Sequence, residues 1–304
     1  MRGHPGSPRG SESVGCRATF GSAERGGKLT HYPTISHTRV PEFLASAWRH
    51  RELVWQLTRR EIVGRYRGTV LGLLWTLVHP LFMVGIYTFV FREVFRARWE
   101  HEVGGPGEFA LVLFAGLIVF SLLTECINRA PLLIVGNPSF VKKVVFPLEV
   151  LPWPVLGSAL FHAAVSFALL FALWAVSQGS LPWTAIALPL PLIPLALLTL
   201  GLSWFLAACG AYLRDTAQTV GLLTVALLFM SPVFYPTSAL PERYRAYLWL
   251  NPLTFVIEEV RGLLFLGQAP SWRGLAAQTV LGFAAAWIGW WCFEKARPGF
   301  ADVL

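Results

Sequence analysis

The chain has 304 residues, of which 55% are hydrophobic and only 14% are charged, and its formal net charge is +8. Soluble domains carry charge on about a quarter of their residues, so this composition excludes an ordinary water-soluble protein and favours an integral membrane protein. In a membrane protein, an excess of Lys and Arg follows from the positive-inside rule and does not require nucleic-acid binding.

Residues 1–40 differ from the rest of the chain in composition. They are rich in Gly, Ser and Arg and contain no apolar run, so they lack the central stretch of a signal peptide. The segment GSAERGGKL resembles a phosphate-binding loop only loosely, because its spacing is one residue too long and Leu29 replaces the Ser or Thr. We predict a disordered N-terminal tail at 1–40 and one transmembrane domain at 41–304.

Residues 42–67 precede the first long apolar run and show helical periodicity. The apolar residues that share one face of such a helix are Leu44, Ala47, Trp48, Val54, Trp55 and Ile62. Arg51 falls on the same face, so the amphipathic pattern is imperfect. The pattern predicts an amphipathic helix lying at the cytoplasmic membrane interface. The alternative is a soluble helix packed on another domain.

Six apolar runs are long enough to span a bilayer, which takes about 20 residues. They cover residues 69–91, 109–127, 150–176, 183–212, 217–234 and 275–293. An even number of spans places both chain ends on one side, and the excess of Lys and Arg on that side predicts that it is cytoplasmic. Within the second run, Glu125 lies one helical turn before Arg129, which predicts an ion pair near the membrane surface.

Residues 237–271 lie between the last two runs, on the outer side. They contain two short helical patterns, and Asn251 followed by Pro252 predicts the start of the second helix. Each is too short to span the bilayer, so we predict short re-entrant or lid helices. Helical spacing places Glu258 and Arg261 on one face, where they can pair. Glu259 and Arg243 are then left for a water-filled mouth or a partner chain.

Motifs for catalysis are absent from the sequence. It contains no HExxH, no GxSxG, no ATP-binding loop and no His or Cys cluster with metal-ligand spacing, and its four cysteines form no CxxC pair. We therefore predict no catalytic residue, no metal and no cofactor in this chain. If the protein is a pump, its energy comes from another chain.

Residues 57–99, LTRREIVGRYRGTVLGLLWTLVHPLFMVGIYTFVFREVFRARW, resemble the opening of ABC-2 type permeases that export lipid-linked polysaccharides. Three further blocks agree in order and spacing: NPSFVKKVVFPLEVLP at 137–152, LRDTAQTV at 213–220, and MSPVFYPTSALPERYRAYLWLNPLTFVIEEVRGLL at 230–264. The resemblance covers roughly residues 42–300. It implies a half-transporter in which two copies pair and two separate ATPase subunits bind ATP and Mg²⁺.

The resemblance also implies a coupling helix at residues 137–147 that rests in a groove of the ATPase. Its candidate contact residues are Asn137, Pro138, Phe140, Lys142, Lys143 and Val144. The alternative for the two lysines is that they obey the positive-inside rule or bind anionic lipid.

Three further groups of side chains are candidates for contact with a lipid-linked glycan. Guanidinium groups match phosphate oxygens, so the interfacial arginines are candidates for binding the carrier's pyrophosphate, with membrane anchoring as the alternative: Arg59, Arg60, Arg65 and Arg67. Aromatic rings stack on sugars, so residues within the runs are conduit candidates, with packing as the alternative: Trp75, Tyr87, Phe229, Phe234 and Tyr235. The candidates for an outer gate are Arg243, Tyr244, Glu258, Glu259 and Arg261.

The leading functional hypothesis is the permease subunit of an exporter of undecaprenyl-linked polysaccharide, with O-antigen favoured, in the bacterial inner membrane. The same machine for teichoic acid or capsule, and an ABC-2 exporter of small hydrophobic molecules, remain alternatives. An integral-membrane transferase is disfavoured, because it needs a polar catalytic cluster at one membrane face. The main charge clusters, RREIVGR and EEVR, fall on opposite faces.

Overall fold

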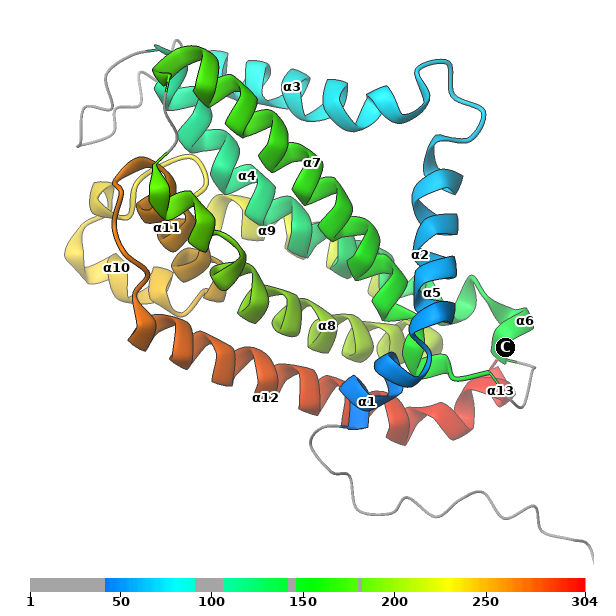
Figure 1. Cartoon of the computed structure of the whole chain (residues 1–304). Coiled ribbons are helices and arrows are strands. Elements are labelled where there is room, and N and C mark those ends of the chain that lie inside the picture. Colours follow the sequence, from blue (N-terminus) through cyan, green and yellow to red (C-terminus); the bar gives the residue numbers. More distant parts are fainter. Residues whose placement is uncertain (1–41, 91–105, 142–145, 180–181, 304) are drawn as a thin grey trace, which may run out of the picture. The chain divides into compact units, whose positions relative to one another are not determined.

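The computed structural model describes residues 42–90, 106–141, 146–179 and 182–303. This part of the chain is helical and contains no strand, which confirms the all-α prediction. The helices in Figure 1 are α1 (Glu42–Arg49), α2 (Arg51–Tyr66), α3 (Trp75–Thr88), α4 (Pro106–Arg129), α5 (Leu132–Val135), α6 (Pro138–Val141), α7 (Pro152–Gln178), α8 (Pro189–Tyr212), α9 (Thr216–Met230), α10 (Glu242–Trp249), α11 (Pro252–Phe265), α12 (Trp272–Ala296) and α13 (Phe300–Val303). The predicted tail at 1–40 lies outside the described residues and stays a prediction.

Four segments of the described chain are long and apolar enough to cross a membrane. They are Glu108–Arg129, Leu148–Ser177, Trp183–Tyr212 and Trp272–Gly299. These segments match four of the six predicted runs. The runs at 69–91 and 217–234 contain shorter helices, α3 with 14 residues and α9 with 15 residues.

Local backbone chemistry explains why α3 and α9 are shorter than their apolar runs. Gly68 and Gly72 adopt positive φ angles of 85° and 52°, a conformation that other residues avoid, so the regular helix begins only at Trp75. A proline disfavours helical backbone at the residue before it. At the end of α9, Ser231 precedes Pro232 and is extended, with φ −98° and ψ 146°. The α9 helix therefore ends at Met230.

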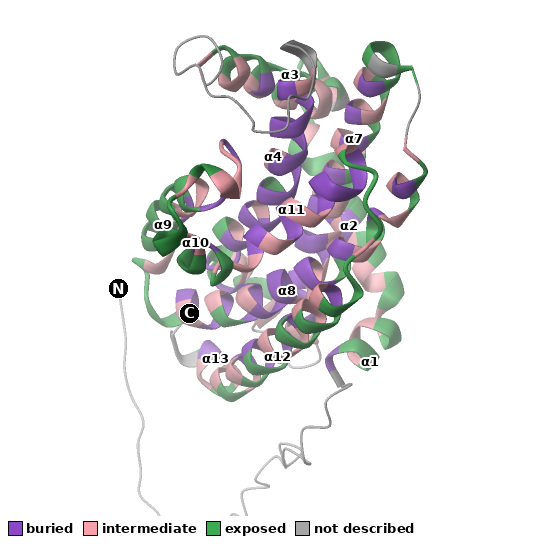
Figure 2. Cartoon of the chain, turned by 90° about the vertical axis from the view of Figure 1, so that its left-hand side faces the viewer, coloured by how far each residue is buried: buried purple, intermediate pink, exposed green. Residues whose placement is uncertain are grey.

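The core of the described chain surrounds α4, which packs against α7, α8, α9 and α11. In Figure 2 the ribbon of α4 is buried along much of its length. Its buried side chains include Leu113, Val119, Leu122 and Cys126. A charged residue on this helix therefore faces protein as well as any lipid, and it needs partners from neighbouring helices.

Glycines bring α8 and α12 into direct backbone contact. A Cβ atom on Gly289 would lie only 2.0 Å from the carbonyl oxygen of Gly201. A Cβ atom on Gly201 would lie 2.3 Å from the carbonyl group of Ala285. Small residues at such crossings let helix backbones approach closely, which is how helices associate where lipid removes the hydrophobic driving force.

The segment predicted as one interfacial helix at 42–67 is broken into α1 and α2. The break is at His50, whose φ of −104° and ψ of 24° are not helical. Trp48 and Trp55 on the predicted apolar face are 74% and 70% exposed. Thr58 is buried against α7, where a Cβ on Gly157 would lie 2.9 Å from its side chain. The helix pair thus binds the bundle by one face and leaves tryptophans free for lipid or a partner.

Both short helices predicted in the outer region are present. The backbone N–H of Leu253 donates to the Asn251 side chain at 3.0 Å, and Pro252 occupies the first turn, which confirms the predicted helix start. The α11 helix is buried by its apolar face against α4 and α8, whereas much of α10 is exposed. The second short helix is therefore an integral part of the helix bundle.

Candidate functional site

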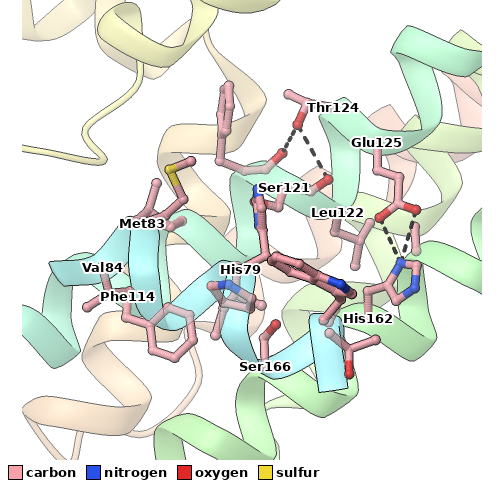
Figure 3. Close-up of a pocket in the computed structure, with 18 of the residues that line it drawn as sticks. His79, Met83, Val84, Phe114, Ser121, Leu122, Thr124, Glu125, His162 and Ser166 are labelled. Atoms are coloured by element: carbon pink, nitrogen blue, oxygen red, sulfur yellow. Dashed lines mark hydrogen bonds and ion pairs between the residues drawn. The ribbon is translucent and has the colours of Figure 1, made fainter. Parts of the chain in front are cut away.

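A cavity of about 820 Å³ lies between α2, α3, α4 and α7. Its wall from α3 contains Trp75, His79, Met83 and Tyr87, and its wall from α4 runs from Phe114 onward. Figure 3 shows the α3 side chains His79 and Met83 across the space from Ser121 and Leu122 of α4. The walls are largely apolar, with polar groups concentrated where α4 ends.

The polar end of the cavity is organised around Glu125. Its two carboxylate oxygens each lie 3.0 Å from Nδ1 of His162 on α7, and Arg65 on α2 forms an ion pair with it (Figure 3 shows the histidine contact). Because a carboxylate can only accept, His162 donates from Nδ1. In the neutral ring, the Tyr66 hydroxyl then donates to Nε2, at 3.1 Å. Glu125 is thereby held from two other helices.

A second ion pair joins α2 and α4 at the same place. Arg129 on α4 pairs with Glu61 on α2, and it also lies 3.8 Å from Glu125. The predicted contact between Glu125 and Arg129 is thus confirmed. The two helices exchange partners reciprocally, since each contributes one glutamate and one arginine.

Glu61 and His162 were not among the residues singled out from the sequence. A lone histidine in an apolar helix is usually a packed residue, and Glu61 sits in an interfacial segment where charge is ordinary. One signal was present: the spacing Glu-x3-Arg occurs twice, as EIVGR at 61–65 and ECINR at 125–129. Such a spacing puts both charges on one helix face. Only the fold shows that the two faces meet.

The four interfacial arginines do not form one group. Arg65 lines the cavity and is paired with Glu125. Arg59 and Arg60 are exposed on α2, and Arg67 follows its end, and none of these three is among the described residues that line the cavity. Their proposed contact with pyrophosphate stays a prediction.

The five candidate conduit aromatics lie in two places. Trp75 and Tyr87 line the cavity. The ring of Tyr87 also lies 5.0 Å from that of Phe234, which in turn lies 6.1 Å from that of Phe229. The hydroxyl of Tyr235 donates to the carbonyl of Phe229 at 3.0 Å.

Phe234 and Tyr235 follow the end of α9 at Met230, so they lie outside the helix of that apolar run, and their placement within a span stays a prediction. Phe234 is 3% exposed and Phe229 is 61% exposed, so only the second of these neighbouring rings is accessible from the protein surface. The role of the aromatics in a conduit stays a prediction.

Arg261 is the most enclosed of the candidate gate residues, with 4% exposure. Its guanidinium donates to the carbonyl oxygens of Pro232 at 2.6 Å and Val233 at 2.8 Å. It also lies 3.5 Å from Glu258, which confirms the predicted pair. The arginine thus ties α11 to the segment that follows α9.

Glu259 has a partner within the chain, and its expected place at a water-filled mouth or a partner chain stays a prediction. Its carboxylate accepts from the backbone N–H of Ser271 at 2.6 Å and from the Ser271 hydroxyl at 2.7 Å. Ser271 stands just before α12, whose first N–H groups need acceptors, so the acid supplies one. Arg243 lies over the ring of Tyr244 at 4.6 Å.

The predicted coupling segment is described in part. Asn137 donates to the carbonyl of Leu133 at 2.9 Å, and α6 begins at Pro138. The ring of Phe140 stacks on Phe146, with centroids 4.4 Å apart and planes 5° from parallel. Lys142, Lys143 and Val144 lie outside the described residues, and the coupling role of the whole segment stays a prediction.

Glu149 follows this segment and was not singled out from the sequence. Its carboxylate accepts from the Ser46 hydroxyl and from Arg297, each at 3.1 Å. Its backbone carbonyl accepts from the indole N–H of Trp204 at 2.9 Å. One residue therefore connects α1, α8 and the end of α12.

Within the described ranges, no group of three or more His, Cys, Asp or Glu side chains has an arrangement that could hold a metal ion. The site is a cavity with paired charges at one end and aromatic side chains along its walls. Such an arrangement suits binding of an amphiphile, in which a polar head and an apolar chain need different surroundings.

Comparison with known proteins gives consistent matches over most of the chain. The family model described as ABC-2 type transporter matches residues 52–265. An O-antigen export system permease protein RfbA of Myxococcus xanthus is 27% identical over 260 residues, covering 84% of this chain and 97% of the relative. One from Klebsiella pneumoniae is 24% identical over 255 residues, covering 83% and 95%. A polysialic acid transport protein KpsM of Escherichia coli is 25% identical over 213 residues, covering 68% and 79%.

Proposed function

Because this chain belongs to the ABC-2 transporter family, we propose that it is the permease subunit of an ATP-driven exporter of lipid-linked polysaccharide in the bacterial inner membrane. The observation that carries the proposal is similarity over 97% of the length of an O-antigen export permease. The four long apolar helices and the cavity with a charged end support it.

The transport unit contains two copies of the chain and two ATPase subunits, which bind and hydrolyse ATP with Mg²⁺. Six segments of each copy cross the membrane, with both termini in the cytoplasm. In this proposal α3 and α9 form the other two membrane-crossing segments, beside the four long helices. At about 1.5 Å per residue they are shorter than the hydrocarbon core of about 30 Å, so each of these two crossing segments extends beyond its helix.

Residues 137–147 transmit the movement of the ATPase to the permease. The support for this role is their position between α4 and α7, together with two adjacent lysines that suit an acidic groove. The ring of Phe140 is stacked on Phe146, so it supports the shape of the segment as well as any contact with the ATPase.

The substrate enters by its phosphate groups at the arginines of α2 and leaves past the outer helices. The position of Arg65 in the cavity wall supports its role in binding the substrate's phosphate groups. The positions of Trp75 and Tyr87 in the same wall support their role in contacting the glycan. The outer helices α10 and α11 form the gate, and α10 is its exposed part.

The substrate proposed first is the lipid-linked O-antigen. The second candidate is a capsular polysaccharide, favoured by similarity to a polysialic acid transport protein over 79% of that protein. The higher coverage of the O-antigen permeases, 97% and 95%, is our reason for proposing O-antigen before capsular polysaccharide. Teichoic acid or a small hydrophobic molecule has no comparable support.

The test is deletion of the gene followed by analysis of the lipid-linked glycans and the cell surface. We expect the surface polysaccharide to disappear while its lipid-linked precursor accumulates on the cytoplasmic side, with rescue by the wild-type gene. An ATPase subunit should co-purify with the permease, and its turnover should rise with the accumulated lipid. A deletion strain with unchanged surface glycans and no accumulated precursor would contradict the proposal.

A further inference from the structure

The helices α2 and α4 are joined by two reciprocal ion pairs at the polar end of the cavity. Arg65 of α2 pairs with Glu125 of α4, and Arg129 of α4 pairs with Glu61 of α2. Each helix presents its glutamate and arginine one turn apart, so the two pairs form from matching faces. Without a ligand, both guanidinium groups are therefore occupied by carboxylate oxygens of the same chain.

Carboxylate and phosphate oxygens are the two kinds of acceptor that a guanidinium group binds best. A phosphate at this place must compete with Glu61 and Glu125 for the same donors. The exposed fractions of the side chains, 36% for Arg129 and 48% for Arg65, leave both arginines accessible to such a competitor. The pairs are therefore replaceable contacts, unlike an ion pair sealed inside a core.

The cavity beside the two pairs fits the remaining part of an amphiphilic anion. Its volume of about 820 Å³ falls within the range of sites that enclose small ligands. Apolar side chains of α3 and α4, including Met83, Val84 and Leu117, line the part away from the charges. A ligand with a phosphate head and an isoprenoid chain matches both surfaces.

We propose that Glu61 and Glu125 are internal substitutes for the phosphates of an isoprenoid diphosphate. In the ligand-free protein they hold Arg65 and Arg129 and so fasten α2 to α4. A bound diphosphate takes over the two arginines and releases this fastening, so that α2 is then held by its packing on α7 and no longer by α4. This inference rests on the proposed function, because it names what regulates the lipid-binding site of the exporter.

His162 can stabilise the carboxylate of Glu125 after Arg65 has moved to the phosphate. Its Nδ1 lies 3.0 Å from both carboxylate oxygens, and Tyr66 supports the other ring nitrogen. A buried carboxylate that loses its partner is strongly destabilising unless other donors are present. The histidine supplies that donor, whereas Glu61, with 32% exposure, can turn to solvent.

The inference is tested by ligand binding to the full-length permease with its ATPase partner in nanodiscs of neutral lipid. Geranylgeranyl diphosphate is the probe, and geranylgeraniol and inorganic pyrophosphate are the comparison ligands. We expect Glu61→Gln and Glu125→Gln each to bind the diphosphate about tenfold more tightly, which is about 1.4 kcal/mol. Geranylgeraniol binding should not change. The matched control is Glu52→Gln, the same charge change at an exposed position on α2, which should bind as the wild type does.

Lower diphosphate affinity in Glu61→Gln would show that the glutamate arranges Arg129 for binding, and it would overturn the inference. Unchanged affinity in both variants, or no binding of the probe by any form, would also overturn it. Inorganic pyrophosphate binding as tightly as the lipid would identify a free anion as the ligand and contradict the isoprenoid part. If Glu125→Gln does not fold, Glu61→Gln decides, since Glu61 is more exposed. None of these results depends on export in cells, which separately tests the proposed function.

Discussion

Gly116 on α4 leaves the space that the guanidinium of Arg261 on α11 occupies. A Cβ atom on Gly116 would lie 2.8 Å from Nη2 of Arg261. From that position the arginine reaches the carbonyls of Pro232 and Val233, which follow the end of α9. The glycine and the arginine therefore act as a unit that joins α11 to α4 and to the residues that follow α9.

Replacing Arg261 by Met should destabilise the protein. The change leaves two buried carbonyls without donors, at a cost of about 2–4 kcal/mol in the free energy of unfolding. The measurement is thermal unfolding in detergent. Arg243→Met is the matched control, because the contact of Arg243 within the described part of the chain is with the Tyr244 ring, and its loss should cost less than about 1 kcal/mol. Equal effects of the two changes would contradict the fastening role of Arg261.

Two Gly→Ala changes should have opposite effects, because Gly289 lies at the contact between α8 and α12 and Gly221 does not. Gly289→Ala places a methyl group 2.0 Å from the Gly201 carbonyl and should cost about 1–3 kcal/mol in the free energy of unfolding. Gly221→Ala in α9 meets nothing within 4 Å and should stabilise its helix by about 0.5–1 kcal/mol. Thermal unfolding of both variants is the measurement. A stable Gly289→Ala protein would show that the close backbone contact is unnecessary.

Lys142 and Lys143 are predicted to couple the permease to its ATPase. Changing both to Glu should leave insertion intact, because one loop rarely sets the topology of several spans, but it should abolish export. The measurements are surface glycan and co-purified ATPase. Lys295→Glu is the control, since Lys295 lies over the Trp291 ring at the end of α12. Continued export by the double variant, with the ATPase still bound, would exclude the coupling role.

Arginine-to-lysine changes separate phosphate binding from membrane anchoring at the interface. Anchoring needs only positive charge, whereas paired phosphate contacts need the guanidinium fork. Arg65→Lys should therefore raise by about tenfold the lipid concentration that gives half-maximal stimulation of ATPase turnover, which corresponds to about 1.4 kcal/mol of affinity. The same change should be made singly at Arg59, Arg60 and Arg67, with Arg214→Lys as the control. Unchanged stimulation in every variant would favour anchoring.

The outer gate predicts that α10 changes its exposure during the transport cycle. Single cysteines at Tyr244 and Tyr247, 46% and 69% exposed, are suitable probes in a chain whose four native cysteines are replaced. Labelling by a membrane-impermeant thiol reagent should differ between the resting ATPase and the ATP-trapped state. Glu259 is unsuitable as a probe, because its loss also removes the acceptor for Ser271. Identical labelling in both states would indicate a rigid outer cap.

The sequence predicted the elements that depend on neighbouring residues. The four long apolar helices, the Asn251 start of α11 and the pairs Glu125–Arg129 and Glu258–Arg261 all follow from short-range periodicity and spacing. Such features lie within one helix, where geometry is regular.

Contacts between helices were not predicted, because periodicity says which face is apolar but not which helix covers it. The pairing of Glu61 with Arg129 and the burial of Arg261 need the tertiary fold. The lengths of α3 and α9 were overestimated for another reason. Hydropathy counts apolar residues, whereas Gly72 and Pro232 decide where the backbone can remain helical.

The contacts of Glu149 have a mechanical consequence. Ser46 near the start of the described chain and Arg297 near its end bind the same carboxylate, and Trp204 holds the backbone of the same residue. A displacement of Glu149 would therefore strain its contacts with Ser46, Arg297 and Trp204 together. If an ATPase pushes on the preceding segment, as we propose, residues near both ends of the described chain would receive that push through one residue.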